Sequence, residues 1–234
     1  MRVRKRIWVL IAACALLAHP ELIAQKRNYD TLPNLPEHYV KRLADFKKQP
    51  IVKGKIIMLG NSITEGGNWK KLLKDSTVIN RGISGDVTFG VINRLDDIIK
   101  RQPSKVFLLI GINDLSRKTP DEVILENLFS IVSKIRSGSP STEVFVQSIL
   151  PTNETFKNFI PNFKGKASSI LTINTQLQRY ANKMKFTYVD LYSKFLDANG
   201  LMDAKYATDG LHLNELGYQH WVSILRSTNK TGIK

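Results

Sequence analysis

The sequence predicts an α/β fold in which parallel strands form a central sheet and helices cover both of its faces. Short apolar runs of strand length recur along the chain, and each is followed by a segment whose apolar residues have helical spacing. No internal repeat or low-complexity tract interrupts this alternation. The chain has 234 residues, which is enough for one such domain with a substantial core.

Residues 1–24 are interpreted as a secretory signal peptide. The first six residues carry four basic side chains, and Ile7 to Ala18 are almost wholly apolar. Leu22-Ile23-Ala24 ends in a small residue, as a signal-peptidase cleavage site before Gln25 requires. The apolar run is too short to span a bilayer as a stable helix. The alternative is a lipoprotein processing site with lipidated Cys14, which would leave a very short apolar run. We therefore expect a periplasmic or extracellular protein, with membrane attachment only if Cys14 is lipidated.

Composition excludes several classes of function. Cys14 is the only cysteine, so a mature chain that begins at Gln25 has no disulfide, thiolate nucleophile or cysteine metal ligand. The net charge of +15 becomes +12 without the first 24 residues, which hold four basic side chains and one acidic one. These basic residues are spread along the chain, and no zinc, RNA-sheet or helix-turn-helix signature accompanies them. No nucleic-acid partner is expected.

Residues 25–50 form a polar lead that contains one helix. The helix is predicted from about Glu37 to Lys47, because Tyr39, Leu43 and Phe46 have helical spacing there. A lead of this kind is expected to pack across the outside of the sheet.

The remaining residues, 51–234, supply the main domain. The apolar runs predict strands at residues 55–59, 77–80, 105–110, 143–149 and 186–191. The helical patterns predict helices at residues 69–73, 87–99, 120–135, 167–184 and 215–225. Because helices separate successive strands, the sheet is expected to be parallel.

Ser62 follows the first predicted strand directly. Gly60, Asn61 and Ser62 turn the backbone sharply from the strand into a helix. The carboxyl ends of strands are where open α/β sheets bind their ligands, and nearby helix amides favour negative charge. Ser62 is therefore either an exposed nucleophile or an ordinary helix N-cap.

Polar residues also follow the other strands. Gly85 lies in a glycine-rich turn after the second strand, and Asn113 follows the third. Asp209 and His212 lie in a loop after the last strand. Since the carboxyl ends of parallel strands share one edge of the sheet, these four clusters are expected to converge.

The converging residue types fit ester hydrolysis by a serine. His212 could take the proton of Ser62, and Asp209, three residues before His212, could orient the imidazole. The amides of Ser62 and Gly85 and the side chain of Asn113 could bind an oxyanion. Each residue taken alone also has a structural interpretation as a cap, a turn former or a packing residue. All of them together, in the required order, favour catalysis.

The chain resembles the SGNH hydrolases, also called the GDSL esterase/lipase family, from about Lys55 to Leu225. The resemblance rests on four sequence blocks: Gly60-Asn61-Ser62-Ile63-Thr64, Ile83-Ser84-Gly85-Asp86, Gly111-Ile112-Asn113-Asp114 and Asp209-Gly210-Leu211-His212-Leu213. It implies a three-layer α/β/α domain with a five-stranded, flavodoxin-like sheet of strand order 2-1-3-4-5. It also implies a serine esterase that needs neither a metal nor a cofactor.

The resemblance assigns roles to the same residues. Ser62 corresponds to the nucleophile, Gly85 and Asn113 to oxyanion donors, and Asp209 and His212 to the acid and the base. Asn61 replaces the aspartate of the family's commonest motif, a change expected to tune the turn and leave the mechanism in place. The first block is most similar to the branch with acetylhydrolase-like and carbohydrate O-acetylesterase-like members.

The substrate is predicted from that branch and from one loop. The segment from Pro151 to Lys166 follows the fourth strand and carries Phe156, Phe159 and Phe163. These aromatic residues are expected to overhang the site and either stack on a sugar ring or line an acyl slot. The sequence therefore predicts hydrolysis of short acyl esters, chiefly acetyl esters of a carbohydrate. Lysophospholipid or thioester hydrolysis, and a non-catalytic carbohydrate-binding role, are the alternatives.

Overall fold

The computed structural model describes residues 35–233, so the predicted signal peptide lies outside the described residues. Five parallel strands form one sheet in the order β2-β1-β3-β4-β5, which confirms the predicted fold class and strand order. The strands are β1 (Ile56–Gly60), β2 (Ile79–Gly82), β3 (Lys105–Leu109), β4 (Glu143–Gln147) and β5 (Thr187–Val189).

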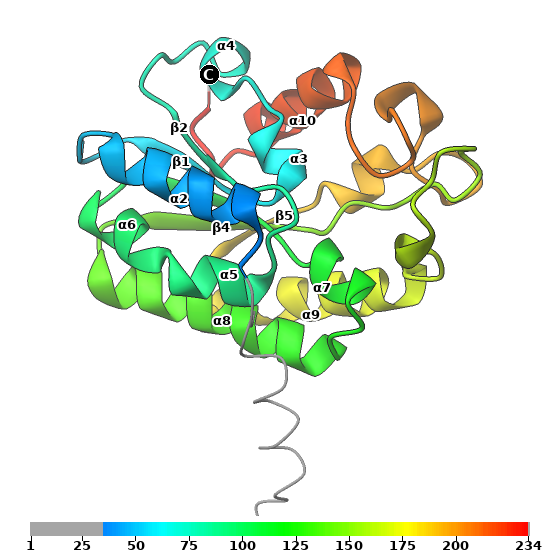
Figure 1. Ribbon diagram of the computed structural model, residues 1–234, viewed down its shortest axis with the longest axis horizontal. Helices are drawn as coiled ribbons and strands as arrows, with labels where there is room; N and C mark the ends of the chain where they lie inside the picture. Colours follow the sequence, from blue (N-terminus) through cyan, green and yellow to red (C-terminus); the bar gives the residue numbers. More distant parts are fainter. Residues whose placement is uncertain (1–34, 234) are drawn as a thin grey trace, which may run out of the picture. The chain divides into compact units, whose positions relative to one another are not determined.

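Helices cover both faces of the sheet (Figure 1). One face carries α3 (Ser62–Glu65), α4 (Trp69–Leu72) and α10 (Glu215–Ser227). The other carries α5 (Thr88–Asn93), α6 (Leu95–Lys100), α8 (Asp121–Gly138) and α9 (Ala167–Met184). The short helix α7 (Ile112–Ser116) follows β3, and three 3₁₀ turns, η1 (Pro161–Phe163), η2 (Tyr192–Phe195) and η3 (Ala204–Tyr206), lie in the later loops.

The main core lies between the sheet and these helices. Its centre is a stacked pair from neighbouring strands, Phe107 and Phe145, with ring centroids 4.6 Å apart. On the same face, Trp69 of α4 meets Trp221 of α10 edge to face at 4.8 Å, and Nε1 of Trp221 donates to Gln147, which points to the same side of β4 as Phe145. Burial of aromatic rings of this size is the main stabilising contribution to such a domain.

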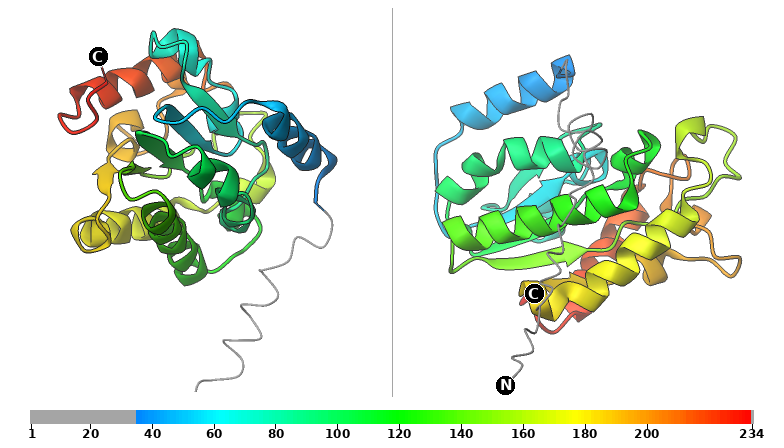
Figure 2. Two further views of the ribbon diagram at one scale, coloured as in Figure 1. Left: turned by 90° about the vertical axis from the view of Figure 1, so that its left-hand side faces the viewer. Right: turned by 90° about the horizontal axis from the view of Figure 1, so that it is seen from below.

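Helix α2 (Glu37–Lys48) lies beside the β2 edge of the domain and not within either helix layer (Figure 2). Its buried Tyr39 and Phe46 form a small separate cluster with Ile83, the residue that follows β2. The hydroxyl of Tyr39 donates a hydrogen bond to the carbonyl of Gly90 in α5. Helix α2 therefore packs against the loop that leaves β2.

Two predicted elements are displaced or broken in the structure, whereas β4, β5 and α8 differ from the prediction only at their ends. The second strand is Ile79–Gly82 and not 77–80, because Ile79 to Gly82 pair in register with Ile57 to Gly60 of β1. The single helix predicted over 87–99 is broken at Arg94, which separates α5 from α6. The side chain of Arg94 binds carbonyl groups at the ends of β1 and β2, a requirement that apolar spacing does not encode.

Candidate active site

Ser62 and His212 meet at the carboxyl edge of the sheet. Ser62 is the first residue of α3, and its Oγ lies 3.0 Å from Nε2 of His212. The two residues are 150 positions apart in the sequence. Ser62 is half-buried and the side chain of His212 is 34% exposed, so the pair is accessible from solvent. This is hydrogen-bond distance for a nucleophile and its base.

Asp209 holds the other side of the imidazole. Its Oδ2 lies 2.7 Å from Nδ1 of His212, and its Oδ1 accepts the backbone N–H groups of Leu211 and His212 at 2.9 and 2.7 Å. Partial burial raises the pKa of Asp209, but these hydrogen bonds outweigh it and hold the pKa below its ordinary value. The carboxylate is therefore ionised and can fix the orientation of the imidazole.

The turn from Asp209 to His212 requires glycine at position 210. Gly210 has φ +80°, and a Cβ there would lie 2.1 Å from the carbonyl oxygen of Asn153. Asn153 supports the turn, because its N–H donates to the carbonyl of Gly210 at 2.8 Å and its side-chain amide donates to the carbonyl of Met202. Asn153 was not singled out in the sequence, where it is one of several asparagines in a polar loop.

The nucleophile helix is only four residues long, and the side chains of its N-cap residue and of a β2 residue hold its two ends. At its start, Oδ1 of Asn61 accepts the N–H of Ile63. At its end, Nδ2 of Asn80 lies within hydrogen-bond distance of the carbonyl groups of Thr64, Glu65 and Gly67. A helix this short has no stability of its own, so these contacts fix the position of Ser62.

Asn61, and not Ser62, is the N-cap of α3, so the interpretation of Ser62 as an ordinary helix cap is wrong; Asn61 itself is buried. Its Nδ2 is also buried and has no hydrogen-bond partner among residues 35–233. An aspartate at this position would have no such donor. The substitution therefore changes the hydrogen bonding of the turn but leaves Ser62 and His212 within hydrogen-bond distance.

The predicted oxyanion donors have hydrogens available. Within the described part of the chain, the backbone N–H groups of Ser62 and Gly85 make no hydrogen bond. Gly85 lies in a turn at φ +76°, a conformation that favours glycine. Asn113 Nδ2 donates one hydrogen to the carbonyl of Asp86 at 2.8 Å, which leaves its second hydrogen for a ligand.

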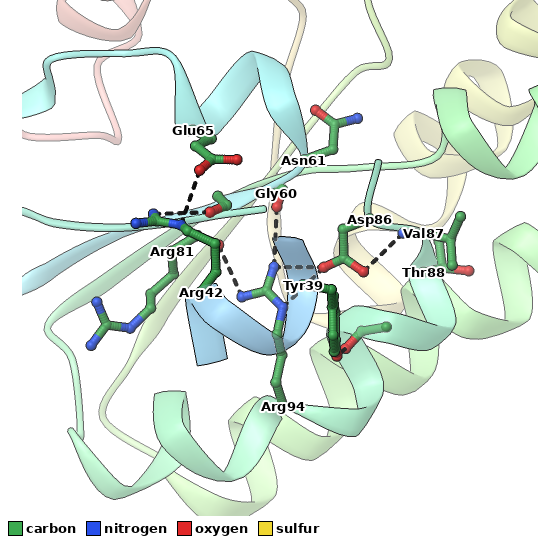
Figure 3. A network of polar contacts seen from close by, with 12 residues as sticks. Tyr39, Arg42, Gly60, Asn61, Glu65, Arg81, Asp86, Val87, Thr88 and Arg94 are labelled. Carbon is green, nitrogen blue, oxygen red and sulfur yellow. Dashed lines mark hydrogen bonds and ion pairs between the residues drawn. The ribbon is translucent and has the colours of Figure 1, made fainter. Parts of the chain in front are cut away.

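Asp86, the residue after Gly85, forms a buried ion pair with Arg94 (Figure 3). Arg94 and Asp86 are 4% and 2% exposed, and Nη2 of Arg94 lies 2.8 Å from Oδ2 of Asp86. The same guanidinium donates to the carbonyl groups of Arg81 and Gly60. Asp86 also accepts the N–H of Val87, but Val87 and not Asp86 is the N-cap of α5, so Asp86 is not an ordinary helix cap. The pair connects the ends of β1 and β2 to residues 83–87, which carry the proposed oxyanion donor Gly85 and are called the oxyanion loop below.

A second buried carboxylate supports Asn113. Asp114 is fully buried and accepts both the N–H and the hydroxyl of Thr88, at 3.0 and 2.6 Å. Asn127 of α8 donates to the same hydroxyl at 2.9 Å. Burial raises the pKa of Asp114 to about 7, although the hydrogen bonds from Thr88 act in the opposite direction. Asp114 thus anchors the backbone next to Asn113 to Thr88, a role not assigned to it from the sequence.

The expectation that three phenylalanines overhang the site is wrong in part. Phe159 and Phe163 are 6% and 8% exposed and belong to the main core, and Phe156 is half-buried against it. Phe159 packs beneath the turn at Gly210. Phe159 and Phe163 are buried because the loop folds back onto the domain, so neither ring can stack on a ligand.

Residues 35–233 contain no helix with the length and apolar character needed to cross a membrane. In the same part of the chain, no group of three or more His, Cys, Asp or Glu side chains is placed to hold a metal ion.

Known proteins with similar sequences are esterases and acylhydrolases. A model of the GDSL-like lipase/acylhydrolase family matches residues 58–220. An arylesterase of Vibrio mimicus is 33% identical over 42% of this chain and 56% of its own length. The platelet-activating factor acetylhydrolase IB subunit alpha2 of Rattus norvegicus is 25% identical over 64% of this chain and 63% of its own length. The chain thus spans less than two thirds of either curated relative.

A solved structure has the same fold over nearly the whole described chain. It is a protein from Streptococcus pneumonia whose name refers to platelet activating factor. It has a TM-score of 0.74 and 28% sequence identity, and the alignment covers 89% of this chain and 98% of that one.

Proposed function

Because this chain belongs to the GDSL-like lipase/acylhydrolase family, we propose that it is a secreted serine esterase that removes short acyl groups, chiefly acetyl, from an O-acetylated carbohydrate. The observation that carries the proposal is the continuous hydrogen-bonded series from Ser62 through His212 to Asp209, with contacts of 3.0 and 2.7 Å. Serine, imidazole and carboxylate in this order form a catalytic triad.

In the proposed reaction, Oγ of Ser62 attacks the ester carbonyl while Nε2 of His212 takes the hydroxyl proton. Asp209 stabilises the imidazolium that forms. The negative oxygen of the tetrahedral intermediate accepts hydrogen bonds from the N–H groups of Ser62 and Gly85 and from Nδ2 of Asn113. Collapse of the intermediate breaks the ester bond, and His212 protonates the leaving alcohol. Water then attacks the acyl-serine with His212 again as the base, and collapse of the second tetrahedral intermediate breaks the bond to Oγ of Ser62. His212 returns its proton to Oγ, and the carboxylic acid leaves.

Two observations support a short acyl group and a polar leaving group. The relative from Rattus norvegicus is named an acetylhydrolase. In the loop next to the catalytic turn, Phe159 and Phe163 are buried, whereas Thr155, Lys157 and Asn158 are exposed. A polar surface beside the triad suits a hydroxylated alcohol better than a long aliphatic chain. Lysophospholipase or thioesterase activity is the alternative within the enzyme class, and a non-catalytic carbohydrate-binding relative is the alternative outside it.

The test of hydrolysis compares wild type with Ser62→Ala on 4-nitrophenyl acetate, using the chain that begins at Gln25. The variant is expected to lose several orders of magnitude in kcat, because the triad acts as a unit. Ser168→Ala, an exposed serine on α9, is the matched control and should retain full activity. Equal activity of wild type and Ser62→Ala would refute the esterase proposal and leave the binding role.

A second assay tests the substrate class. Rates on acetylated xylan oligosaccharides, a lysophospholipid and an acyl thioester are compared with rates on acetate, butyrate and longer nitrophenyl esters. The proposal expects acetate and the acetylated sugar to give the highest kcat/KM. A preference for long acyl chains would replace it with the lysophospholipase alternative.

Secretion is proposed from the character of residues 1–24. The exported protein is expected to begin at Gln25, which N-terminal sequencing would establish. If Cys14→Ser released a membrane-attached form, the lipoprotein alternative would be correct.

A further inference from the structure

The carboxylate of Glu65 joins three segments that are far apart in the sequence. Glu65 is the last residue of α3, the helix that Ser62 begins. Its Oε2 accepts both the N–H and the hydroxyl of Ser84, at 2.6 and 2.7 Å. Ser84 lies directly before Gly85, whose N–H is the proposed oxyanion donor. Glu65 therefore connects the nucleophile helix to the oxyanion loop.

Helix α2 holds the same carboxylate from the other side. Nε2 of His38 lies 3.0 Å from Oε2 of Glu65, and Nε of Arg42 lies 3.0 Å from Oε1 (Figure 3 shows Arg42 beside Glu65). Arg42 also donates to the carbonyl of Gly82, at the end of β2. Burial raises the pKa of Glu65, but Ser84, His38 and Arg42 together hold it below its ordinary value. The carboxylate is thus ionised and tightly held.

The packing of α2 is directed at the same loop. Its buried Tyr39 and Phe46 contact Ile83, the residue before Ser84, in a cluster separate from the main core. On the far side of the oxyanion donor, Arg117 donates to the carbonyl of Gly85 at 2.9 Å. The peptide that carries the Gly85 N–H is therefore held on both sides, by Glu65 through Ser84 and by Arg117.

We propose that Glu65 is a positioning residue for the oxyanion hole, and that helix α2 acts on catalysis through it. His38 and Arg42 orient the carboxylate, the carboxylate fixes Ser84, and Ser84 directs the N–H of Gly85 towards the developing oxyanion. Helix α2 lies outside residues 58–220, which match the family model. The side chains that orient Glu65 therefore come from a segment N-terminal to the matched residues. The inference rests on the proposed esterase function.

The test uses the whole chain and the variants Glu65→Gln, Glu65→Ala and Ser84→Ala. A misdirected oxyanion donor weakens transition-state binding and leaves ground-state binding intact, so kcat should fall while KM stays within about twofold. Glu65→Ala should lose about 10- to 100-fold in kcat, below the loss of about 100- to 1000-fold that follows removal of a whole donor. Glu65→Gln, which can still accept the Ser84 N–H, should lose less.

A boronic acid separates positioning from a purely structural role. Phenylboronic acid forms a tetrahedral adduct with a catalytic serine, so its inhibition constant reports the oxyanion hole without turnover. The constant should rise in parallel with the loss of kcat/KM. Glu122→Gln, an exposed carboxylate in the first turn of α8, is the control and should change neither value. An unchanged boronate constant in Glu65→Gln, or a raised KM with normal kcat, would overturn the proposal.

The role of α2 has its own test. Arg42→Gln should lower kcat, and its effect should not add to that of Glu65→Gln, because both act through the same carboxylate. Additive losses would show that α2 acts by another route. If Glu65→Ala fails to fold, Ser84→Ala decides whether Glu65 acts through Ser84. This variant removes the Ser84 hydroxyl and leaves the contacts of Glu65 with His38 and Arg42 intact. An inactive Ser62→Ala with fully active Glu65 variants would refute this inference alone, whereas an active Ser62→Ala would refute the esterase itself.

Discussion

The two halves of the site are built in different ways. The nucleophile side comprises α3, the oxyanion loop and the start of α7, and its supporting side chains Asp86, Arg94 and Asp114 are at most 4% exposed. The acid–base turn, residues 207–213, is more open, with the side chains of Asp209 and His212 19% and 34% exposed. Contacts between distant segments fix the side chains of the first half, whereas hydrogen bonds within a few residues orient the side chains of Asp209 and His212 in the second, although Asn153 supports the backbone of their turn. Loss of a supporting side chain on the nucleophile side should therefore cost stability as well as activity, and side-chain changes at Asp209 and His212 should cost activity alone.

The largest effect is expected from Asp209→Asn in the acid–base turn. The amide cannot stabilise the imidazolium and favours the wrong tautomer, so kcat should fall by about 10⁴-fold. The asparagine oxygen can still accept the N–H groups of Leu211 and His212, so the free energy of unfolding should change by less than about 1 kcal/mol. Esterase assays and urea unfolding measure the two quantities.

Asp197→Asn is the control for that change. Asp197 also accepts backbone N–H groups two and four residues ahead, in an exposed turn without a histidine. It should alter neither kcat nor stability appreciably. If Asp209→Asn unfolded the protein, the acid–base turn would be a structural element like the nucleophile side, and the contrast between the halves would fail.

Arg94→Met, on the nucleophile side, should lower the free energy of unfolding, in contrast to Asp209→Asn. It leaves Asp86 as a buried charge without its partner, which costs about 3–5 kcal/mol in the free energy of unfolding. Lys48→Met is the control, because Lys48 and Asp45 form an exposed ion pair that contributes at most about 1 kcal/mol. Urea unfolding of both variants measures the difference. Equal stabilities would mean that the Asp86–Arg94 pair does not support the oxyanion loop.

The contrast also explains what the sequence could predict. The Asp209-x-x-His212 spacing is local, so the contact at 2.7 Å could be anticipated from one turn of backbone. Ser62, Gly85 and Asn113 were found because parallel topology places the carboxyl ends of strands along one edge. The sheet followed from apolar runs and their alternation with helices. The main differences are the shifted bounds of β2 and the break at Arg94, and β4, β5 and α8 differ at their ends.

The supporting contacts could not be predicted in the same way. Arg94 looks like one charged residue in a helical pattern, and nothing in its neighbours shows that it binds the carbonyl groups of Gly60 and Arg81. Glu65 and Ser84 meet only because β1 and β2 are adjacent in the sheet, and Arg42 approaches from a helix whose position depends on packing. The burial of Phe159 depends on how its loop folds back, which its aromatic and polar composition leaves open.

The smallest expected effect is a pH dependence of the free energy of unfolding, and it comes from Asp114 on the nucleophile side. Its pKa is raised from an ordinary 3.8 to about 7 in the folded protein, first because of burial and to a lesser degree because of the nearby Asp86. Between these two values the folded state keeps a proton that the unfolded state has lost. The stabilisation from this proton is fully present below about pH 4 and is lost as the pH rises through about 7.

Asp114→Asn removes this dependence, because an amide does not titrate. The free energy of unfolding of wild type, relative to that of the variant, should therefore fall by about 3 kcal/mol between pH 5 and pH 8. Asp86 is present in both proteins, so its own titration largely cancels in the difference. Ser168→Ala, on α9, removes no titratable group and is the control that should show no such trend relative to wild type. A difference that stays constant with pH would mean that Asp114 is ionised throughout. The nucleophile side would then hold an ionised carboxylate at Asp114 in spite of its burial, as the more exposed acid–base turn does at Asp209. The two halves would then not differ in the charge state of these carboxylates.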